Sequence, residues 1–431
     1  MELLVLGLFC VSLLLCLATG LSILYALVLG LLLFMLYGRH KGFAWKELLN
    51  MALAGVKTVQ GILITFLLIG VMTALWRAAG TIPTIVTYAS GLIRPSVFLL
   101  MTFLLCGAVS ILTGTSLGTA ATMGVICASM GTAMGASPLL TGGAVLSGAF
   151  FGDRCSPVST SALLVAAVTK TDIYDNIRRM VKSALVPFLL TCAVYLALGL
   201  FLPRGGGVLD LEALFSRAFV LHPVTLLPAA AILVLAAFRV KVKAAMCASI
   251  LTAVPICLFL QGIPPAEVLR AAVFGFVPQD PQVAAMVSGG GVLSMLRVSA
   301  IVCLSSSYSD LFDKTGLLDG AKHAAASLAA KTTPFAATLV SSILSGMLAC
   351  NQTLAILLTH ELCADVYADG SDMALDLEDT AVVTSPLIPW SIAVATPLTT
   401  VGAPIASVCA AFYLMLLPLW RLLLSLRRTK S

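Results

Sequence analysis

The sequence predicts an all-α polytopic membrane protein with about 12–14 transmembrane segments, in two inverted-topology repeats with broken or re-entrant helices at the centre. Three observations predict this class. Of the 431 residues, 60% are hydrophobic and only 10% are charged, whereas soluble domains carry about 25% charged residues. Apolar runs near the ~20 residues that a membrane span requires follow one another along the chain. Polar, proline-containing segments interrupt these runs once in each half.

The composition also excludes several classes of function. The longest polar interval, residues 365–379, is too short for a soluble domain. Nearly all of the 12 cysteines lie within apolar runs and none forms a CxxC pair, so we interpret them as small apolar residues between helices. The four histidines show no metal-ligand spacing. We interpret the net charge of +6 as a result of membrane topology, so the expected partner is the lipid bilayer and not nucleic acid.

The basic residues predict the orientation of the chain, because cytoplasmic loops are rich in Lys and Arg. One topology places all of the basic clusters on the cytoplasmic side, together with both termini. The first two apolar runs form a hairpin that we expect to be retained, since they lack the basic leader of a cleaved signal peptide. A multi-pass protein of the inner (plasma) membrane is expected, with the number of full crossings within residues 333–401 left open. The basic clusters are residues 39–46, 170–182, 239–243, 314–331 and 421–430.

Faint internal matches divide the chain into two repeats, residues 1–205 and 206–431. Three pairs of segments match in the same order, at offsets of 232, 236 and 229 residues. On the predicted topology each half has an odd number of crossings, so the halves are inverted, as in many secondary transporters. The pairs are SILTG at 110–114 with SILSG at 342–346, ALWRAAGTI at 74–82 with DLFDKTGLL at 310–318, and GDRCSP at 152–157 with EDTAVVTSP at 378–386.

The segment SGAFFGDRCSPVSTS, residues 147–161, is the most informative part of the chain. It places Asp153, Arg154 and several hydroxyl groups beside Gly148, Gly152 and a proline within an apolar run. A charge at the centre of a bilayer helix costs ~2.5–3.5 kcal/mol, and glycine and proline free backbone groups that lipid cannot satisfy. A segment that combines a charge with freed backbone groups must be buried in protein or line a water-filled cavity. A transport site has these properties.

Five stretches of the chain resemble the NhaC-type sodium/proton antiporter family, within the wider ion-transporter superfamily. This resemblance implies an ion-coupled secondary transporter, in the first place a Na+/H+ antiporter that carries Na+ and H+, has no further cofactor and is not an enzyme. No ATP-binding GxxxxGK[ST] motif occurs. Members that exchange malate for lactate imply the alternative, an ion-coupled transporter or exchanger of a small organic solute such as a carboxylate or amino acid. The superfamily resemblance also implies a homodimer. The stretches are GVMTALWRAAGTIPTIVTYASGLIRPSVFL (70–99), GTSLGTAATMG (114–124), SGAFFGDRCSPVS (147–159), SGGGVLSM (288–295) and LEDTAVVTSPLIPW (377–390).

Two departures from the family pattern bear on the substrate. After SPxS the family usually continues with an acidic residue, where this chain continues with Thr160 and Ser161. Where the second half usually reads Gly-Asp-Gln, this chain has Cys350, Asn351 and Gln352. Two carboxylate positions are therefore neutral, which favours the organic-solute alternative.

The candidate site combines both interruptions, and its expected Na+ ligands are Asp153 and Asp379. A carboxylate among hydroxyl groups offers the oxygen ligands that a hard cation prefers. Two alternatives stay open for Asp153, which could pair with Arg154 or cap the helix that follows. The candidate ligands are Asp153, Ser156, Ser159, Thr160, Thr115, Thr119, Asn351, Gln352, Asp379, Thr384 and Ser385.

Other polar residues in or near the apolar runs also receive expected roles. Arg154 and Arg297 either bind a substrate carboxylate or act as counter-ions to Asp153 and its neighbours. Glu378 is interpreted as solvated at the membrane edge, because an acidic loop precedes it. The GTSLGT segment, residues 114–119, either supplies oxygen ligands or allows close helix packing.

Overall fold

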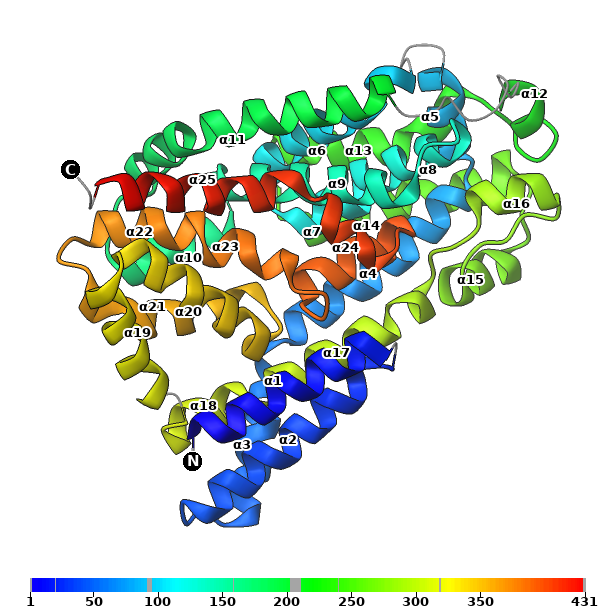
Figure 1. Ribbon diagram of the computed structural model, residues 1–431. Coiled ribbons are helices and arrows are strands. Elements are labelled where there is room, and N and C mark those ends of the chain that lie inside the picture. Colours follow the sequence, from blue (N-terminus) through cyan, green and yellow to red (C-terminus); the bar gives the residue numbers. More distant parts are fainter. Residues whose placement is uncertain are drawn as a thin grey trace.

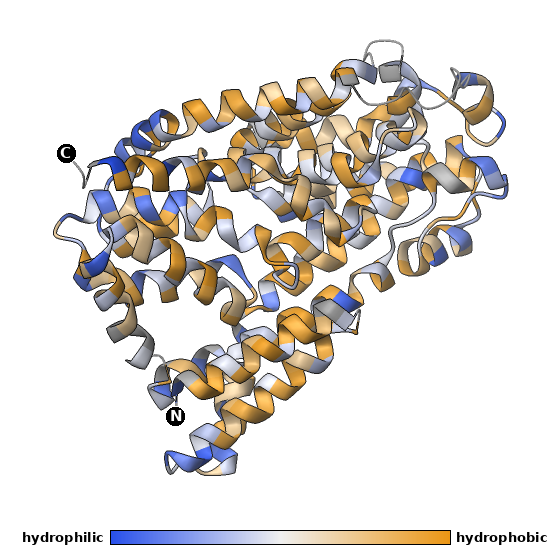
Figure 2. Ribbon diagram, viewed as in Figure 1, coloured by the Kyte–Doolittle hydropathy of each residue, from blue (hydrophilic) through white to orange (hydrophobic). Residues whose placement is uncertain are grey.

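The protein is built from helices (Figure 1). The structure, a computed structural model, describes residues 2–19, 21–90, 95–157, 159–201, 211–238, 240–317 and 319–428. Within these ranges no β-strand occurs, and the only sheet-like pairing is an isolated bridge between Phe276 and Gly289. Apolar residues cover most of the long helices (Figure 2), and many large apolar side chains are exposed on the outer surface. The predicted all-α membrane fold is confirmed.

An N-terminal group of helices lies at the lower edge of Figure 1. Helices of the second half pack onto the N-terminal hairpin through an aromatic cluster of Phe9, Phe34, Tyr308 and Phe312, whose rings lie 5.0–6.0 Å apart. This cluster explains why the hairpin is anchored although most of its outer face is exposed. The group comprises α1 (Glu2–Thr19), α2 (Ile23–His40), α3 (Trp45–Thr58), α17 (Leu296–Ser306) and α18 (Ser309–Thr315).

A second group forms around α4, which leads from the N-terminal group into the body of the protein. α4 lies beside α14, where Trp76 Nε1 donates a hydrogen bond of 2.8 Å to Ser249 Oγ. The glycines before α17 also approach α4 closely, since the Gly291 backbone N–H donates to the Gly70 carbonyl at 2.7 Å. The group comprises α4 (Gln60–Ala78), α5 (Thr81–Ser90), α12 (Leu211–Phe215), α13 (Leu227–Ala237), α14 (Val242–Pro255), α15 (Pro265–Phe274) and α16 (Pro281–Val287).

The third group joins segments of both halves and contains both polar interruptions. From the first half come α6 (Phe98–Thr113), α7 (Ser116–Thr119), a π-helical turn (Ala120–Gly124), α8 (Val125–Ala133), α9 (Pro138–Arg154), α10 (Thr160–Thr169) and α11 (Ile173–Phe201). The C-terminal α25 lies along α11 (Figure 1). From the second half come α19 (Asp319–Lys331), α20 (Pro334–Ala349), α21 (Gln352–Cys363), α22 (Gly370–Asp379), α23 (Ala381–Thr384), α24 (Ile392–Val401) and α25 (Phe412–Arg428).

Broken helices shorten many of the apolar segments. In the described residues, six helical stretches are long and apolar enough to span a membrane alone, and a seventh is the pair Gly370–Leu387 and Ile392–Val401, bent by 53°. Four shorter apolar helices do not reach the span length, among them Thr160–Thr169 and Pro334–Ala349. The prediction was about 12 segments, rising to about 14 when broken helices are counted separately, which is more than these candidate spans. The inverted relation of the two halves stays a prediction.

The two halves share one local arrangement. α6 ends at Gly114 in the left-handed conformation (φ 62°), and the Thr115 side chain then caps α7. The same sequence of features recurs 236 residues later. α20 ends at Cys350 with φ 54°, and the Asn351 side chain caps α21. In each case the cap accepts a hydrogen bond from the backbone N–H three residues later, at 3.3 and 2.8 Å. The sequence placed a helix opening at both positions, which is confirmed.

Candidate functional site

α9 carries Asp153 in its last turn and packs closely against α6. Gly148 and Gly152 lie within the regular helix, where a Cβ at either position would be 2.4 Å from a backbone carbonyl oxygen of α6. The expectation that these glycines free backbone groups is wrong, because they instead let the two helix backbones approach each other. α9 ends at Arg154 and α10 begins at Thr160, so the predicted interruption around Asp153 is confirmed. Close packing on one side and a break on the other fix the position of Asp153.

The Asp153 carboxylate is buried, at 3% exposure, and is surrounded by hydroxyl groups. Its Oδ1 accepts a hydrogen bond of 2.8 Å from Ser159 Oγ, and its Oδ2 accepts one of 3.2 Å from Ser161 Oγ. The Ser116 hydroxyl, at the start of α7, faces the same carboxylate. Within the described part of the chain, no basic side chain forms an ion pair with Asp153. The alternative of a pair with Arg154 is therefore wrong.

The break also gives α10 its N-terminal cap. The Ser159 side chain accepts hydrogen bonds from the backbone N–H groups of Ser161 and Ala162, at 3.2 and 3.5 Å. Ser159, and not Asp153, is thus the cap of this helix, and its hydroxyl proton remains available to the Asp153 carboxylate. The Ser159 side chain therefore caps α10 and also orients the Asp153 carboxylate.

Arg154 is fully buried and has no free donor. Its Nε donates to the backbone carbonyl of Glu378 at 3.1 Å, and one terminal nitrogen donates to the Met180 carbonyl and the Tyr413 hydroxyl, at 3.2 and 3.3 Å. The other terminal nitrogen donates to Ser183 Oγ and to the Asp379 carboxylate. All five N–H groups of a guanidinium are then used. Arg154 acts as a counter-ion to Asp379 and offers nothing to a substrate carboxylate.

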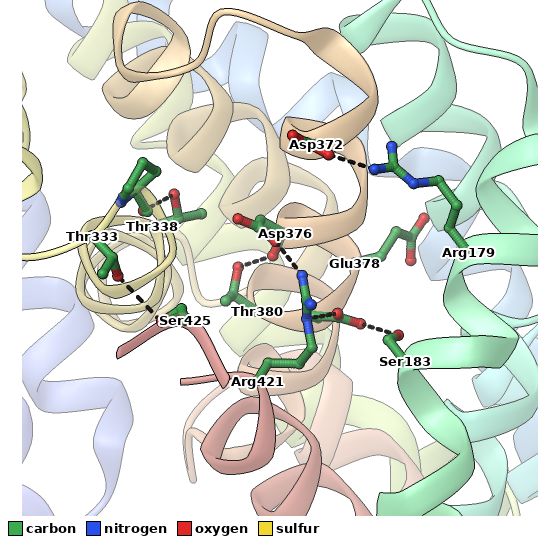
Figure 3. Close-up of polar contacts among 12 residues, drawn as sticks. Arg179, Ser183, Thr333, Thr338, Asp372, Asp376, Glu378, Thr380, Arg421 and Ser425 are labelled. Atoms are coloured by element: carbon green, nitrogen blue, oxygen red, sulfur yellow. Dashed lines mark hydrogen bonds and ion pairs between the residues drawn. The ribbon is translucent and has the colours of Figure 1, made fainter. Parts of the chain in front are cut away.

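Asp379, in the last turn of α22, lies between two arginines. Besides Arg154, its carboxylate contacts Arg421 of α25, with Oδ2 2.6 Å from Nε. Arg421 also donates to Asp376 Oδ1 at 2.7 Å, and Ser183 Oγ donates to Asp379 at 3.1 Å. Figure 3 shows Arg421 of α25 reaching Asp376 of α22, with Ser183 of α11 nearby. The carboxylate expected as the second Na+ ligand is therefore already neutralised by arginine.

Glu378 is the carboxylate that sequence reasoning assigned wrongly. It is 0% exposed and not solvated at a membrane edge. Neither carboxylate oxygen has a hydrogen-bond partner in the described part of the protein. The side chain leaves α22 toward the helix that carries Arg179, on the side opposite to Asp376 (Figure 3).

A cavity of about 670 Å³ adjoins the hydroxyl groups around Asp153. Two of the predicted ligands, Thr115 and Thr160, line it, and each is the chain neighbour of a serine that faces Asp153. Lys241, the residue before α14, and Lys243, in the first turn of α14, line the same cavity. The cavity therefore leads from a basic cluster, predicted to be cytoplasmic, to the residues beside the buried carboxylate.

Two other candidates of the first half, and Arg297, serve local contacts in this structure. Ser156 Oγ donates to the Ile111 carbonyl at 2.7 Å, and Thr119 Oγ1 donates to the Thr115 carbonyl at 2.9 Å. Arg297 is exposed at the start of α17 and lines a different cavity, of about 390 Å³. None of the three contacts Asp153 through a hydrogen bond or ion pair that the described structure contains.

The second-half candidates gather where α20, α21 and α23 meet. Gln352 Nε2 donates to the Val382 carbonyl at 2.9 Å, and the Asn351 amide donates to the Ala349 carbonyl at 3.1 Å. Thr384 Oγ1 contacts Ser342 Oγ at 3.3 Å, and Ser385 Oγ donates to a backbone carbonyl of its own helix. Through these contacts the second interruption packs against the start of α21. In the same way, the first interruption faces Ser116 at the start of α7.

The polar cluster at the ends of α9 and α22 contains more carboxylates than guanidinium groups. Four carboxylates, Asp153, Asp376, Glu378 and Asp379, meet two guanidinium groups. The guanidinium groups contact Asp376 and Asp379, so Asp153 and Glu378 are left without a counter-charge in the described structure. An unpaired buried ion costs several kcal/mol, and protons or a bound cation remove this cost. An excess of buried acid over base is an arrangement that can hold protons or a cation.

Known proteins match this chain over most of its length. The sequence profile of the Na+/H+ antiporter family matches residues 2–169 and 150–426. A Na+/H+ antiporter NhaC from Alkalihalophilus pseudofirmus is 28% identical, over 92% of this chain and 88% of that protein. A malate-2H+/Na+-lactate antiporter from Bacillus subtilis is 27% identical, over 85% of this chain and 81% of its own. An arginine/ornithine antiporter from Halobacterium salinarum is also 27% identical, over 87% and 80%.

These relatives are membrane antiporters and not enzymes. The family match covers both halves of the chain and both polar interruptions, and the structure adds a helical membrane fold with buried, unpaired carboxylates. The chain is a multi-pass membrane protein that belongs to the Na+/H+ antiporter family.

Proposed function

We propose that the protein exchanges Na+ for H+ across the inner (plasma) membrane, with both termini in the cytoplasm. The observation that carries the proposal is the Asp153 carboxylate, which is buried among three serine hydroxyls without a basic partner in the described structure. A hard cation takes oxygen ligands of this kind. The NhaC relatives support the choice of Na+ and H+.

In this mechanism Asp153 holds either a proton or Na+. With a proton bound, the carboxyl group is neutral and needs no counter-charge in its buried position. With Na+ bound, the ionised carboxylate and the Ser159 and Ser161 oxygens are the ligands that this segment offers. Both states are neutral overall, whereas the empty ionised state is costly. This difference couples release of one cation to binding of the other.

The cavity beside Thr115 and Thr160 supports a cytoplasmic route to this site. Arg154, Asp379 and Arg421 hold α25 against the ends of α9 and α22 and keep the unpaired carboxylate in place. A homodimer, which the family resemblance implies, is part of the proposal and has no contact surface assigned.

The test uses purified protein in liposomes with a pH gradient and an internal pH-sensitive dye. Added Na+ collapses the gradient for the wild-type protein, and Asp153→Asn abolishes the response. Asp175→Asn, a change at an exposed carboxylate of α11, is the matched control and leaves the response intact. A wild-type protein that leaves the gradient unchanged at every Na+ concentration contradicts the proposal.

A second candidate function is exchange of a small organic anion. The specific observation is the cavity itself, whose volume of about 670 Å³ falls within the range of small-molecule sites. Lys241 and Lys243 line it together with threonine hydroxyls, and ammonium groups attract carboxylates. The malate/lactate relative supports this candidate.

The lysines separate the two candidates. For an organic-anion exchanger, the double variant Lys241→Gln with Lys243→Gln raises the KM for labelled malate or lactate uptake about tenfold, the effect of roughly 1.4 kcal/mol. Lys46→Gln, a change at an exposed lysine in the first turn of α3, is the control. For a Na+/H+ antiporter the wild-type protein takes up neither anion, and the double variant still collapses the pH gradient when Na+ is added.

A further inference from the structure

A cavity of about 390 Å³ lies where the N-terminal group of helices meets α24. Three helix ends contribute to its wall. Ile23 is the first residue of α2, Arg297 is the second residue of α17, and Thr399 lies in the last turn of α24. α2 and α17 both belong to stretches that are long and apolar enough to span a membrane. Because the ends of such helices lie near the lipid head groups, the cavity is expected at the depth of the head groups.

The wall of this cavity is apolar except for one basic group. Among the described residues that line it, Arg297 is the only charged one, and the others are apolar apart from the Thr399 hydroxyl. Leu21 and Ile405, which also line the cavity, are 57% and 41% exposed. Leu296, the chain neighbour of Arg297, is 55% exposed. Exposed apolar side chains around a cavity mark a surface that meets a membrane or another apolar partner.

Arg297 has no acidic partner in the part of the chain that the structure describes. In this it differs from Arg154 and Arg421, which both contact Asp379. A guanidinium group offers its N–H donors in a planar fork that matches phosphate oxygens. An uncompensated charge beside apolar side chains in a membrane is costly, so an anion from outside the protein is the expected partner. This cavity shares no lining residue with the cavity of about 670 Å³ beside Asp153.

We propose that this cavity binds the head group of an acidic membrane phospholipid, with the phosphate on Arg297 and the acyl chains along Leu21, Leu296 and Ile405. A volume of about 390 Å³ is at the small end of the range of small-molecule sites, so the head group enters and the chains stay in the bilayer. A zwitterionic head group would add a second cation beside Arg297, where no carboxylate lines the cavity to receive it. The bound lipid joins α2 and α17 to α24, and this role is separate from the proposed exchange.

Native mass spectrometry of the purified protein in detergent, with added dioleoylphosphatidylglycerol or dioleoylphosphatidylcholine, tests the proposal. We expect one phosphatidylglycerol molecule to bind the wild-type protein about tenfold more tightly than phosphatidylcholine, the effect of a charge-assisted hydrogen bond. Arg297→Gln removes this preference, and Arg297→Lys keeps part of it. Arg270→Gln is the matched control and keeps the full preference. Arg270 is an exposed arginine of α15 that also has no ion pair among the described residues.

Glycerol 3-phosphate, which has the phosphate but no acyl chains, distinguishes a lipid site from a site for a soluble anion. We expect it not to displace phosphatidylglycerol at equal concentration, and displacement overturns the lipid proposal. An unchanged preference for phosphatidylglycerol in Arg297→Gln overturns it as well.

A second variant decides in the case that Arg297→Gln does not fold. Thr399→Phe adds a ring at an exposed position of the cavity wall and leaves Arg297 in place. This variant lowers the affinity for phosphatidylglycerol when the cavity holds the head group. An unchanged affinity contradicts the proposal. Exchange of Na+ for H+ is measured separately in liposomes, so failure of the lipid site leaves the proposed function standing.

Discussion

Arg154 and Asp379 form a buried ion pair that joins the end of α9 to the end of α22, with both side chains 0% exposed. The two residues lie 225 positions apart and come from opposite halves of the chain. Arg421 contacts the same carboxylate from α25. This network connects the first polar interruption to the second and holds the unpaired acids beside it.

Removal of one partner from this pair destabilises the fold. Arg154→Gln leaves the Asp379 charge partly uncompensated and removes five hydrogen bonds, so we expect a loss of about 3–5 kcal/mol. The measurement is the unfolding temperature in detergent micelles. Arg178→Gln is the matched control, because Arg178 pairs with Asp175 at the surface of α11, with both side chains at least 70% exposed, and such pairs contribute little. Equal unfolding temperatures for the two variants contradict this account.

Asp379→Asn separates the structural carboxylate from the binding one. We expect a lower unfolding temperature, because the buried Arg154 and the partly buried Arg421 lose their shared partner. The number of protons released per Na+ bound stays at the wild-type value, since Arg154 and Arg421 already compensate Asp379. The check is the proton release on Na+ binding, followed with a pH indicator dye in weakly buffered detergent solution. A count that falls by one would return Asp379 to the binding site.

Ser159→Ala tests the double role of this side chain. The loss of the α10 cap costs about 1 kcal/mol, and the loss of the hydrogen bond to Asp153 raises the KM for Na+ in the liposome assay. Ser391→Ala is the control. Ser391 lies 232 residues later and caps α24, accepting from the Ala393 N–H at 3.3 Å. We expect Ser391→Ala to lower the unfolding temperature similarly without a change in KM. If Ser159→Ala and Ser391→Ala raise the KM for Na+ equally, the loss of a helix cap explains the shift. The hydrogen bond from Ser159 to Asp153 would then have no role of its own in binding.

Gly152→Ala tests the contact between α6 and α9. The new methyl group would lie 2.4 Å from a backbone oxygen of α6, so the helices must separate, at a cost of about 1–3 kcal/mol. The measurement is again thermal unfolding in detergent. The control is Gly7→Ala in α1, where nothing lies within 4 Å of the added Cβ and alanine is the better helix former. A Gly152→Ala variant as stable as Gly7→Ala would contradict the close packing.

Local sequence signals located the helix breaks, but they did not identify the caps. Thr115 and Asn351 follow the ends of long apolar helices, and their side chains favour cap positions, although they were interpreted from the sequence only as ligands. The cap offered for α10 was Asp153, whereas the structure gives this role to Ser159. The breaks depend on residues a few positions apart in the chain, so composition and spacing were sufficient to find them.

Long-range partners could not be predicted in this way. Arg421 read as one of several basic residues near the C-terminus, yet its side chain is only 18% exposed and bridges two acids of α22. The choice between Glu378 and Asp379 depends on which side of a helix end meets α9 and α25, which adjacent positions in a sequence do not reveal. The glycines of α9 were misinterpreted because breaks and close contacts both favour glycine.

The most direct test of the central claim is equilibrium binding of radiolabelled Na+ to the purified protein at two pH values. The account predicts that the Na+ affinity of the wild-type protein rises with pH as the competing proton leaves Asp153, by up to about tenfold per pH unit. Asp153→Asn, with an unfolding temperature near that of the wild-type protein, binds no Na+. An affinity independent of pH, or full binding by Asp153→Asn, would contradict the claim that Asp153 holds Na+ and H+ in turn.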